Sequence, residues 1–523
     1  MWEPRFTLHG FRYVEMRGFP GVPTLENLVG RVVRSAVERT GRFTCSNPLV
    51  NQIHDTICWT FASNFQSVPQ DAADRSERVA WLGDSGFLGE DFLYNFDTAA
   101  FWSKWIDDIR DTQKPDGDVP VVSPIHWRRT HDPYSRFPAW VSTYPLLVWY
   151  VYWHCDDERI LTEHFEGIKA LVEFLGNEAY CERAEGGEYD GSGFDPSDKR
   201  EFIVPCGLGD HMEPRADGSS SFAPERTPVA LTSTAYYYWD VWMLARVAEI
   251  LGKKADATHY GELAAKIKGA FNREFLDEGT NQYATGSQTS NALPLSLGMV
   301  PPDREAAVAR NLIDDIAINH KGHVSTGIIG INALAYALPE CGAANTLYDM
   351  INRSTFPSWG YQISQGATTL WETWDGNPEE KLSYNMKMFG GIDKFFYRDL
   401  AGIRPAAPGY RRIEIKPNMV GDLSFVRAEV QTVRGSVAVD WHRDDQSLAL
   451  QVSLPVNSQA HVRIPTMGLE NIAIAEGGTC LWKQGSYIGD VEGISGGRLS
   501  DGYVTLEVES GTYDFRLTGN KEI

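Results

Sequence analysis

Between about residue 45 and residue 400, apolar side chains recur at the spacing of an α-helix. One such face begins after Pro48 and consists of Leu49, Ile53, Ile57, Phe61 and Phe65. Further helical runs lie near residues 87–112, 139–154, 160–175, 237–251, 260–271, 303–319, 327–338, 342–352 and 389–400. The links between paired runs are short, which favours a toroid or bundle of helix hairpins over β-α-β units.

The two ends of the chain follow a different period. Past Pro405 apolar and polar residues alternate in short runs, which predicts a small antiparallel β-sandwich. Residues 6–8, 11–14 and 32–33 also predict strands, too few to form a domain alone. We therefore expect a mostly α chain with three parts: a short N-terminal β segment (1–42), a helical toroid (43–402) and a C-terminal β-sandwich (403–523). The Gly- and acid-rich stretch 182–199 predicts a surface loop.

The net charge and the cysteine content limit the classes of partner that we expect this protein to bind. The 523 residues carry a formal net charge of −22 and are 12% aromatic, which disfavours nucleic-acid and anionic-membrane partners and suits a neutral substrate. The seven cysteines are scattered and never spaced as Cys-x-x-Cys, which predicts free thiols and no zinc site. The N-terminus has no apolar leader, so we expect a cytoplasmic protein. A periplasmic or secreted location stays open if an upstream signal has been lost.

Two carboxylate clusters carry the candidate chemistry. Residues 71–86 bring four acids and two arginines together with Trp81, and residues 371–376 place Glu372 between Trp371 and Trp374. Carboxylates bind or protonate sugar oxygens, arginine fixes a carboxylate, and an indole covers the apolar face of a pyranose. Two distant clusters of this kind predict a glycosidase with two opposed acids. The alternative for the first cluster is a plain salt-bridge network.

The order of several motifs resembles the α-L-rhamnosidases of glycoside hydrolase family 78. The stretches that carry the resemblance are Pro4-Arg5-Phe6-Thr7, Cys45-Ser46-Asn47-Pro48-Leu49, Arg75-Ser76-Glu77-Arg78, Trp81-Leu82-Gly83-Asp84, Pro357-Ser358-Trp359-Gly360-Tyr361, Gln365-Gly366-Ala367-Thr368-Thr369-Leu370-Trp371-Glu372-Thr373-Trp374-Asp375-Gly376 and Ala407-Pro408-Gly409-Tyr410. They extend from Pro4 to at least Pro417. The resemblance implies an (α/α)6 toroid with a C-terminal β-sandwich, no cofactor or catalytic metal, and inversion at the anomeric carbon.

The resemblance also implies roles for individual residues. Glu77 matches the general acid of the family and Glu372 its general base, and such a pair needs about 6.5–9.5 Å between the carboxyl groups. The expected substrate-binding residues are Asp71, Arg75, Trp81, Asp84, Asp210, Trp359, Trp374, Met386 and Lys387. His54, His126, His211 and His323 are not spaced as metal ligands and are expected to be structural.

Two departures from the family pattern affect the site. Ala72-Ala73-Asp74 stands where the family has Cys-Pro-Gln, and Ser383-Tyr384-Asn385-Met386-Lys387 stands for Ser-Phe-Asn-His-Tyr. Met386 thereby replaces a histidine that contacts the sugar. We expect Lys387 to bring a cation to the substrate, so that anionic substrates are preferred over simple aryl α-L-rhamnosides. The alternative is that Lys387 points to solvent and Met386 only packs.

The sequence therefore predicts an inverting exo-glycosidase that removes terminal α-L-rhamnose or a closely related sugar. The alternatives are a catalytically idle carbohydrate-binding protein on a glycosidase toroid, and a related glycosidase of different sugar specificity. Retention of both Glu77 and Glu372 favours the enzyme, because a binding protein needs no acid and base on opposite walls. The expected partner is a carbohydrate, with no nucleic acid and no membrane, and a homodimer is left open.

Overall fold

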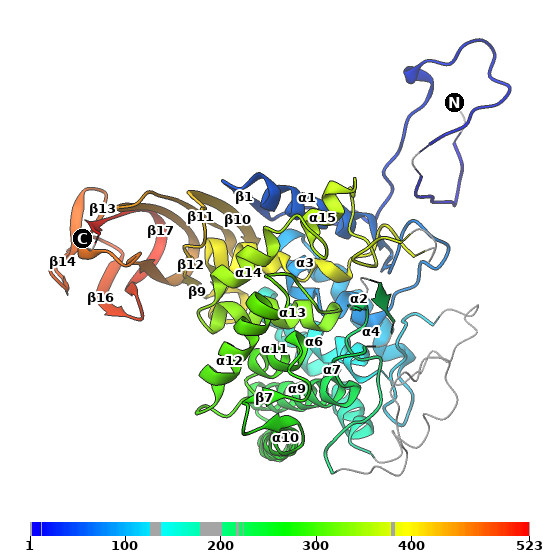
Figure 1. Cartoon of the computed structure of the whole chain (residues 1–523), viewed down its shortest axis with the longest axis horizontal. Helices are drawn as coiled ribbons and strands as arrows, with labels where there is room; N and C mark the ends of the chain where they lie inside the picture. The colour runs from blue at the N-terminus through cyan, green and yellow to red at the C-terminus, as the bar shows by residue number, and fades with distance from the viewer. Residues whose placement is uncertain are drawn as a thin grey trace.

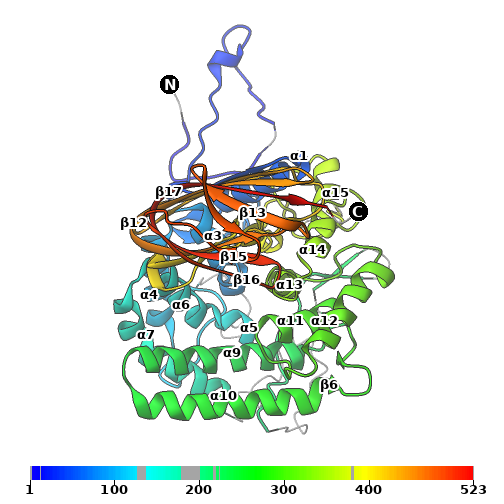
Figure 2. The same ribbon diagram turned by 90° about the vertical axis from the view of Figure 1, so that its left-hand side faces the viewer.

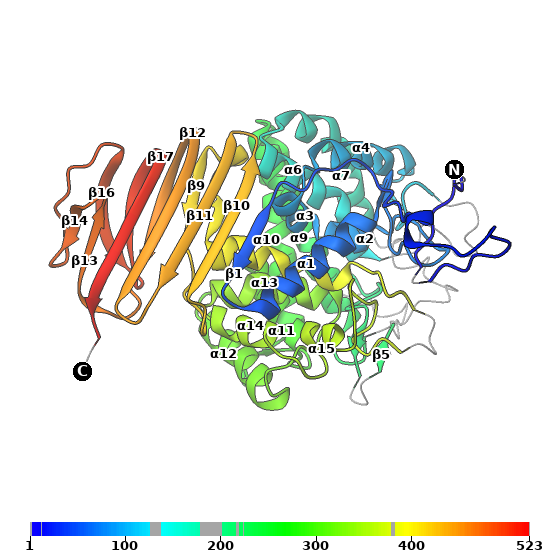
Figure 3. The same cartoon turned by 90° about the horizontal axis from the view of Figure 1, so that it is seen from above.

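The computed structural model describes residues 3–11, 13–125, 137–177, 201–215, 219–222, 224–377 and 382–521. The predicted loop at 182–199 and His126 lie outside these residues. The described chain forms a helical body and a β domain that lie side by side (Figures 1 and 3). Among these residues, no helix combines the length and the apolar composition that crossing a membrane requires.

The helical body is built from hairpins of consecutive helices. Its helices are α1 (Pro48–Ser63), α2 (Leu82–Gly86), α3 (Gly89–Asn95), α4 (Ala99–Thr112), α5 (Pro138–Val141), α6 (Thr143–Cys155), α7 (Glu158–Leu175), α9 (Val229–Ile250), α10 (Lys254–Phe275), α11 (Gln288–Ser296), α12 (Glu305–Asp314), α13 (Ile328–Glu340), α14 (Ala344–Ile351), α15 (Trp359–Ser364) and α16 (Asp393–Phe395). The helical runs predicted from the sequence are confirmed. The prediction missed α11, whose apolar pattern is short and contains Pro294.

Packing explains why neighbouring helices differ in composition. Helix α9 contacts α6, α7 and α10 and is buried along most of its length, so apolar residues cover nearly its whole surface. Its hairpin partner α10 buries one face only, and the two long helices run side by side in Figure 2. Gly252 closes the turn between them with φ +69°, a conformation that glycine adopts without strain.

The C-terminal domain is a mostly antiparallel sheet built around two long strands, with one parallel pair between β9 and β12. Its strands are β8 (Ile403–Pro405), β9 (Arg412–Ile415), β10 (Phe425–Thr432), β11 (Gly435–Arg443), β12 (Ser447–Pro465), β13 (Glu470–Glu476), β14 (Thr479–Lys483), β15 (Ser486–Tyr487), β16 (Ile494–Ser500) and β17 (Tyr503–Asn520). The main path runs β1-β10-β11-β12-β17-β13-β14-β15. Leu450 of β12 pairs with Phe515 of β17, and both side chains are fully buried, as the period of two requires.

The N-terminal segment corrects the prediction of three early strands. Within the described part of residues 3–41 the structure has only a 3-10 helix at Leu25–Asn27, and this segment extends away from the body in Figure 1. Phe6 and Tyr13 are fully or almost fully exposed. The predicted strands meet no partner strand among the described residues, so their backbone groups gain no ladder hydrogen bonds. The first strand, β1 (Arg42–Cys45), instead pairs with β10 of the C-terminal sheet.

Candidate functional site

The two carboxylate clusters of the sequence meet at one guanidinium. Arg75 Nη1 lies 2.8 Å from Glu372 Oε2, and Arg75 Nη2 lies 2.8 Å from Glu77 Oε2. Because both oxygens bind neighbouring nitrogens of one planar fork, they are at most about 8 Å apart. Arg75 and Glu77 are each 27% exposed in their side chains, so this part of the site is open to solvent.

Trp81 orients Glu77 from the start of α2. Its indole Nε1 donates to Glu77 Oε1 at 2.9 Å. The Trp81 backbone is fixed by an isolated β-bridge to Val122, and Trp81 is the last residue before the helix. Trp81 and Arg75 thus both contact the Glu77 carboxylate.

Glu372 lies deeper than Glu77 and is held by two neighbours. Its side chain is 3% exposed, and Oε2 accepts a hydrogen bond from the Ser383 backbone N at 2.7 Å as well as from Arg75. Burial raises the pKa of Glu372, while Arg75 and the Ser383 N–H oppose that rise. A carboxylate with a raised pKa is a stronger base, which suits the activation of water.

Asp71 and Asp84 form a buried floor beneath these groups. Burial is the largest cause that raises the pKa of Asp71 to about 8 and of Asp84 to about 6. Asp71 Oδ1 accepts from Val79 N, and Trp140 donates to Asp84. Asp71 Oδ2 and Asp84 Oδ1 accept no hydrogen bond from the described residues, although Oδ2 of Asp71 lies 3.6 Å from Arg75 Nη2. Asp71, predicted to bind the substrate, is 0% exposed in this structure.

Lys387 and Met386, both predicted to contact the substrate, are buried in this structure. Lys387 is 0% exposed and its ammonium donates to the Gln70 carbonyl. Met386 forms an isolated β-bridge with Ala72 and its backbone N donates to Leu370 O at 2.9 Å. Its side chain belongs to the core, as the packing alternative predicted.

The predicted sugar-stacking indoles Trp359 and Trp374 also belong to the core. Trp374 is 0% exposed, and its ring stacks on Phe389 with centroids 4.2 Å apart. Trp359 meets Trp374 edge to face and donates to the Phe389 carbonyl at 2.9 Å. Phe389 thus covers one face of the Trp374 ring. Of the predicted tryptophans, only Trp81 is partly exposed beside the two glutamates.

Asp210 lies at the N-terminus of α13 and not on the substrate side. It is 0% exposed and accepts hydrogen bonds from Gly327 N at 2.9 Å, Gly330 N at 3.0 Å and the Thr289 hydroxyl. Burial raises its pKa to about 7. The Asp210 carboxylate thereby provides acceptors for two backbone N–H groups at the N-terminus of α13, which have no partner within the helix, and these contacts are those of a structural residue.

Two family descriptions match this chain over the helical body and the start of the β domain. Residues 38–400 match the bacterial α-L-rhamnosidase six-hairpin glycosidase domain, and residues 402–478 match the bacterial α-L-rhamnosidase C-terminal domain. The chain belongs to the bacterial α-L-rhamnosidases of glycoside hydrolase family 78. The match confirms the predicted toroid of helix hairpins followed by a C-terminal β domain.

Similar proteins agree with this assignment to the rhamnosidase family. An α-L-rhamnosidase of Streptomyces avermitilis is 30% identical over 99% of this chain and 46% of its own length, and one of Formosa agariphila is 30% identical over 90% and 49%. The structure of α-L-rhamnosidase from Dictyoglumus thermophilum has a TM-score of 0.87 and 38% identity over 99% of this chain and 55% of its own. The Streptomyces avermitilis enzyme complexed with L-rhamnose has a TM-score of 0.82 and 29% identity, covering 98% of this chain and 46% of its own. The chain thus spans about half the length of the curated relatives it matches.

Sequence reasoning missed three residues of this rhamnosidase-family site. Asp74, noted only as a departure from the family, accepts hydrogen bonds from Tyr384 N at 2.8 Å and from the Ser383 hydroxyl. It thereby fixes the loop whose Ser383 N–H holds Glu372. Trp140 supports Asp84 from α5, and its ring is 5.9 Å from that of His211. The signal for Asp74 was its place inside the first cluster, and the signal for His211 was its place next to Asp210; Trp140 comes from a distant segment with no local signal.

A second group of metal-type side chains lies inside the helical body. His54, Cys58 and Asp393 are buried, and their ligand atoms lie within 4.8 Å of one another. His54 Nδ1 is 2.7 Å from Asp393 Oδ1, and Arg39 Nη2 lies 2.9 Å from His54 Nε2. Since a guanidinium can only donate, both ring nitrogens of His54 are occupied by protein partners. The group is thus a hydrogen-bond network, which agrees with the structural role predicted for His54.

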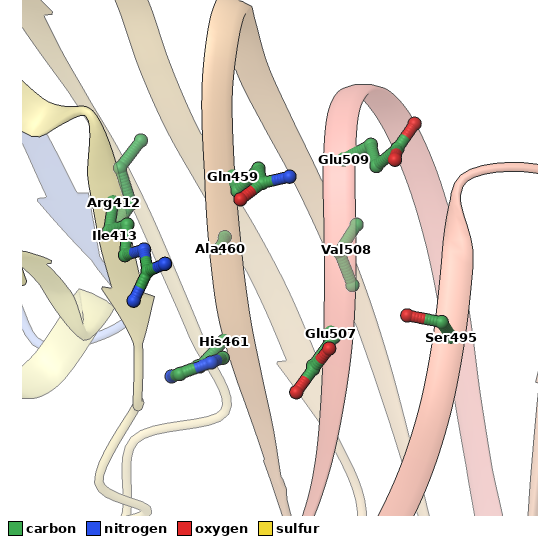
Figure 4. Close-up of a pocket in the computed structure, with 9 residues that line it drawn as sticks. All are labelled: Arg412, Ile413, Gln459, Ala460, His461, Ser495, Glu507, Val508 and Glu509. Atoms are coloured by element: carbon green, nitrogen blue, oxygen red, sulfur yellow. The ribbon is translucent and has the colours of Figure 1, made fainter.

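A shallow hollow of about 170 Å³ lies on the β domain, away from the carboxylate clusters (Figure 4). It is lined by residues of β9, β12, β16 and β17, among them Arg412, His461, Glu507 and Glu509. None of its lining residues is Trp, Tyr or Phe, so it lacks the indole or phenol face on which a pyranose packs. The two glutamates of the helical body remain the candidate site of this family member.

Proposed function

We propose that this protein is an inverting exo-acting glycoside hydrolase that removes terminal α-L-rhamnose. The observation that carries the proposal is the bridge of Arg75 between Glu77 and Glu372, two carboxylates from distant parts of the chain. Inverting glycosidases use one carboxylic acid and one carboxylate with room for a water between them. The α-L-rhamnosidase names of the relatives, and the L-rhamnose complex of one similar structure, supply the sugar.

Glu77 is the general acid and Glu372 the general base of the proposed reaction. The solvent-facing Glu77, oriented by Trp81, protonates the oxygen of the leaving group as the glycosidic bond breaks. Glu372 takes a proton from the water that attacks the anomeric carbon from the opposite face. Because Arg75 covers Glu372, Arg75 has to withdraw from it when sugar and water enter. Arg75 and Trp81 are the remaining proposed sugar contacts.

The floor carboxylates act electrostatically in this proposal. Asp71 and Asp84 lie under Arg75 and Glu77 and stabilise the positive charge that develops on the sugar ring in the transition state. Since Lys387 is turned inward, nothing in the site requires an anionic substrate. We therefore replace the preference for anionic substrates by the proposal that neutral aryl α-L-rhamnosides are good substrates.

A panel of 4-nitrophenyl glycosides tests the function directly. We expect release of 4-nitrophenol from the α-L-rhamnopyranoside and much slower release from the α-L-arabino-, α-L-fuco-, β-D-gluco- and α-D-mannopyranosides. NMR of the fresh product should show β-L-rhamnose first. Turnover of a different glycoside alone would identify another specificity. Binding of L-rhamnose in calorimetry without any turnover would identify the idle binding protein.

We propose the cytoplasm, a reducing compartment, as the place of action. Cys45, Cys58, Cys155, Cys206, Cys341 and Cys480 are free thiols in the structure. Disulfides form and persist in oxidising compartments, and thiols stay reduced where glutathione and thioredoxin maintain them. Fractionation of the native host with an antibody against the chain tests this: recovery from the periplasm or the medium would contradict it.

A further inference from the structure

Asp74 joins the loop of the proposed general acid to the loop that holds the proposed general base. Its Oδ2 accepts a hydrogen bond from Tyr384 N at 2.8 Å, and its Oδ1 accepts one from the Ser383 hydroxyl. These two donors are neighbours in the chain and lie 310 and 309 residues beyond Asp74. The two loops are therefore connected by hydrogen bonds that do not involve Arg75.

The Ser383 backbone contacts Glu372 in both directions. Ser383 N donates to Glu372 Oε2 at 2.7 Å, and Glu372 N donates to the Ser383 carbonyl at 2.9 Å. The next N–H along the chain, that of Tyr384, donates to Asp74. Two successive N–H groups thus bind two carboxylates, one each, so the direction of the Ser383 N–H depends on the hydrogen bonds to Asp74.

The same stretch is connected on its other side to the C-terminal end of α1. Asn385 Oδ1 accepts hydrogen bonds from Ser63 Oγ at 3.0 Å and from Asn64 Nδ2 at 3.1 Å. Asn385 N in turn donates to Ser383 Oγ at 2.9 Å. Helix α1 thus fixes the stretch to the helical body, and Asp74 fixes it to the loop of the proposed general acid.

The contact of Ser383 with Glu372 becomes decisive when Arg75 withdraws. In the structure, Glu372 Oε2 accepts hydrogen bonds from Arg75 and from Ser383 N. The proposed reaction requires Arg75 to leave Glu372 as the sugar and the water enter. Ser383 N is then the remaining donor to this carboxylate among the described residues. A displacement of about 1 Å costs a catalytic group about 10²-fold in rate.

We infer that Asp74 is a positioning residue that keeps the Ser383 N–H directed at Glu372 while Glu372 activates water. The inference rests on the proposed function of that same site. Asp74 acts through Ser383 and Tyr384, and the proposed sugar contacts at Arg75 and Trp81 are unchanged by its replacement. The expected loss is therefore in kcat, with KM within about twofold of wild type.

The test compares two replacements of Asp74 that differ in shape. Asp74→Ala removes both acceptors, and kcat should fall by about 10- to 100-fold. Asp74→Asn keeps the shape and an oxygen for Tyr384 N, so its kcat should stay within about threefold of wild type. Wild-type kcat in Asp74→Ala would overturn the inference. Equal losses in the two variants would also overturn it, because the charge and not the hydrogen bonds would then matter.

Ser383→Ala keeps the test available if Asp74→Ala does not fold. It breaks one of the two hydrogen bonds to Asp74 and keeps the Ser383 N–H, so we expect a loss of about threefold in kcat. A wild-type kcat in Ser383→Ala, measured where Asp74→Ala cannot be purified, would overturn the inference.

A double-mutant cycle tests whether Asp74 acts through Glu372. When Asp74→Ala is added to Glu372→Gln, kcat should change by less than about twofold, because the base that Asp74 positions is already absent. If the two losses multiply instead, Asp74 acts by another route and the inference is wrong.

Asp444→Ala is the matched control outside the site. Asp444 lies in the turn between β11 and β12 and makes contacts of the same kind. It accepts hydrogen bonds from Gln446 N at 2.8 Å, from Ser447 N at 2.7 Å and from the Ser447 hydroxyl at 2.8 Å. Its replacement should leave kcat at the wild-type value, which is what an aspartate that only fixes a loop does.

Amide hydrogen exchange separates this inference from the proposed function. In Asp74→Ala the Ser383 and Tyr384 amides should exchange at least about tenfold faster than in wild type, and in Asp74→Asn they should stay close to it. Unchanged exchange in Asp74→Ala would overturn the role of Asp74 even in a protein without rhamnosidase activity. Faster exchange in a protein whose wild type shows no turnover would instead reject only the proposed function.

Discussion

Two buried carboxylate regions of this chain were both predicted to bind the substrate, and they differ in the structure. At the N-terminus of α13, both oxygens of Asp210 accept hydrogen bonds, from two backbone N–H groups and one hydroxyl. At the floor of the site, Asp71 and Asp84 each keep one oxygen that accepts no hydrogen bond from the described residues. Burial is the largest cause of the raised pKa in all three groups.

This difference in hydrogen bonding separates two roles of a buried carboxylate. A carboxylate whose donors are supplied by the backbone stabilises the fold, and its removal leaves those donors without a partner. A buried carboxylate with an oxygen that accepts no hydrogen bond destabilises the fold, and it is retained where its charge contributes to catalysis. The contrast assigns Asp210 to the scaffold and Asp71 and Asp84 to the site, which the sequence motifs alone grouped together.

Replacement of Glu372 gives the strongest test of this comparison. Glu372 is buried and hydrogen-bonded like Asp210, and yet it is assigned to catalysis. Glu372→Gln keeps an acceptor for Ser383 N and loses the base, so we expect kcat to fall by about 10²- to 10⁴-fold with little change in Tm. Azide needs no base, so in Glu372→Ala it should restore attack and yield a rhamnosyl azide of inverted configuration. If Glu372→Gln had a lower Tm and an unchanged kcat, Glu372 would have a structural role like that of Asp210.

Glu77 should show the opposite dependence on the substrate. A general acid matters most when the leaving group is poor, so Glu77→Gln should lower kcat/KM by about 10²- to 10⁴-fold on an alkyl rhamnoside. On 2,4-dinitrophenyl α-L-rhamnoside, whose leaving group needs no proton, the loss should be much smaller. Equal losses on both substrates would contradict the role of Glu77 as the acid. Glu372→Gln is the matched control, since loss of the base affects both substrates alike.

Both the fold and the two clusters could be predicted from the sequence, because they depend on local patterns. Buried apolar residues recur with a period of about 3.6 residues in α7 and of two residues in β12. Which side chains reach the substrate could not be predicted, since burial is a tertiary property. Trp374 lies within a matching motif and Lys387 in a stretch that departs from the family pattern. Phe389 stacks on Trp374, and the Gln70 carbonyl accepts a hydrogen bond from Lys387 inside the protein. The strands predicted before residue 40 failed for a related reason: alternation predicts a strand only where a partner exists.

The same isosteric change in the two carboxylate regions should have separate effects. In Asp210→Asn, the amide NH₂ faces a donor where the carboxylate accepted one, so we expect a loss of about 2 kcal/mol in the free energy of unfolding, with kcat/KM within about threefold of wild type. In Asp84→Asn, no backbone donor from another helix is left unpaired, and we expect a stability change under about 1 kcal/mol. There kcat/KM should fall by about 10²-fold, because a charge beneath the transition state is lost. Urea unfolding and initial rates on the same preparations measure both, and an exchange of the two outcomes would reverse the assignment.

The smallest expected effects are those of replacing Trp81 and Trp374, two of the tryptophans that were predicted to bind the substrate. Trp81→Phe keeps an aromatic ring and loses the Nε1 donor that orients Glu77, so we expect kcat to fall by about tenfold with Tm nearly unchanged. Trp374→Phe leaves a gap beside Phe389 and the Thr326 carbonyl without its donor, which should cost about 2 kcal/mol in the free energy of unfolding. Because Trp374 is 0% exposed, KM for an aryl rhamnoside should then stay within about twofold. If Trp374→Phe had wild-type stability and a strongly raised KM, Trp374 would be a sugar-binding residue. If Trp81→Phe had an unchanged kcat, the proposed role of Trp81 at Glu77 would be wrong.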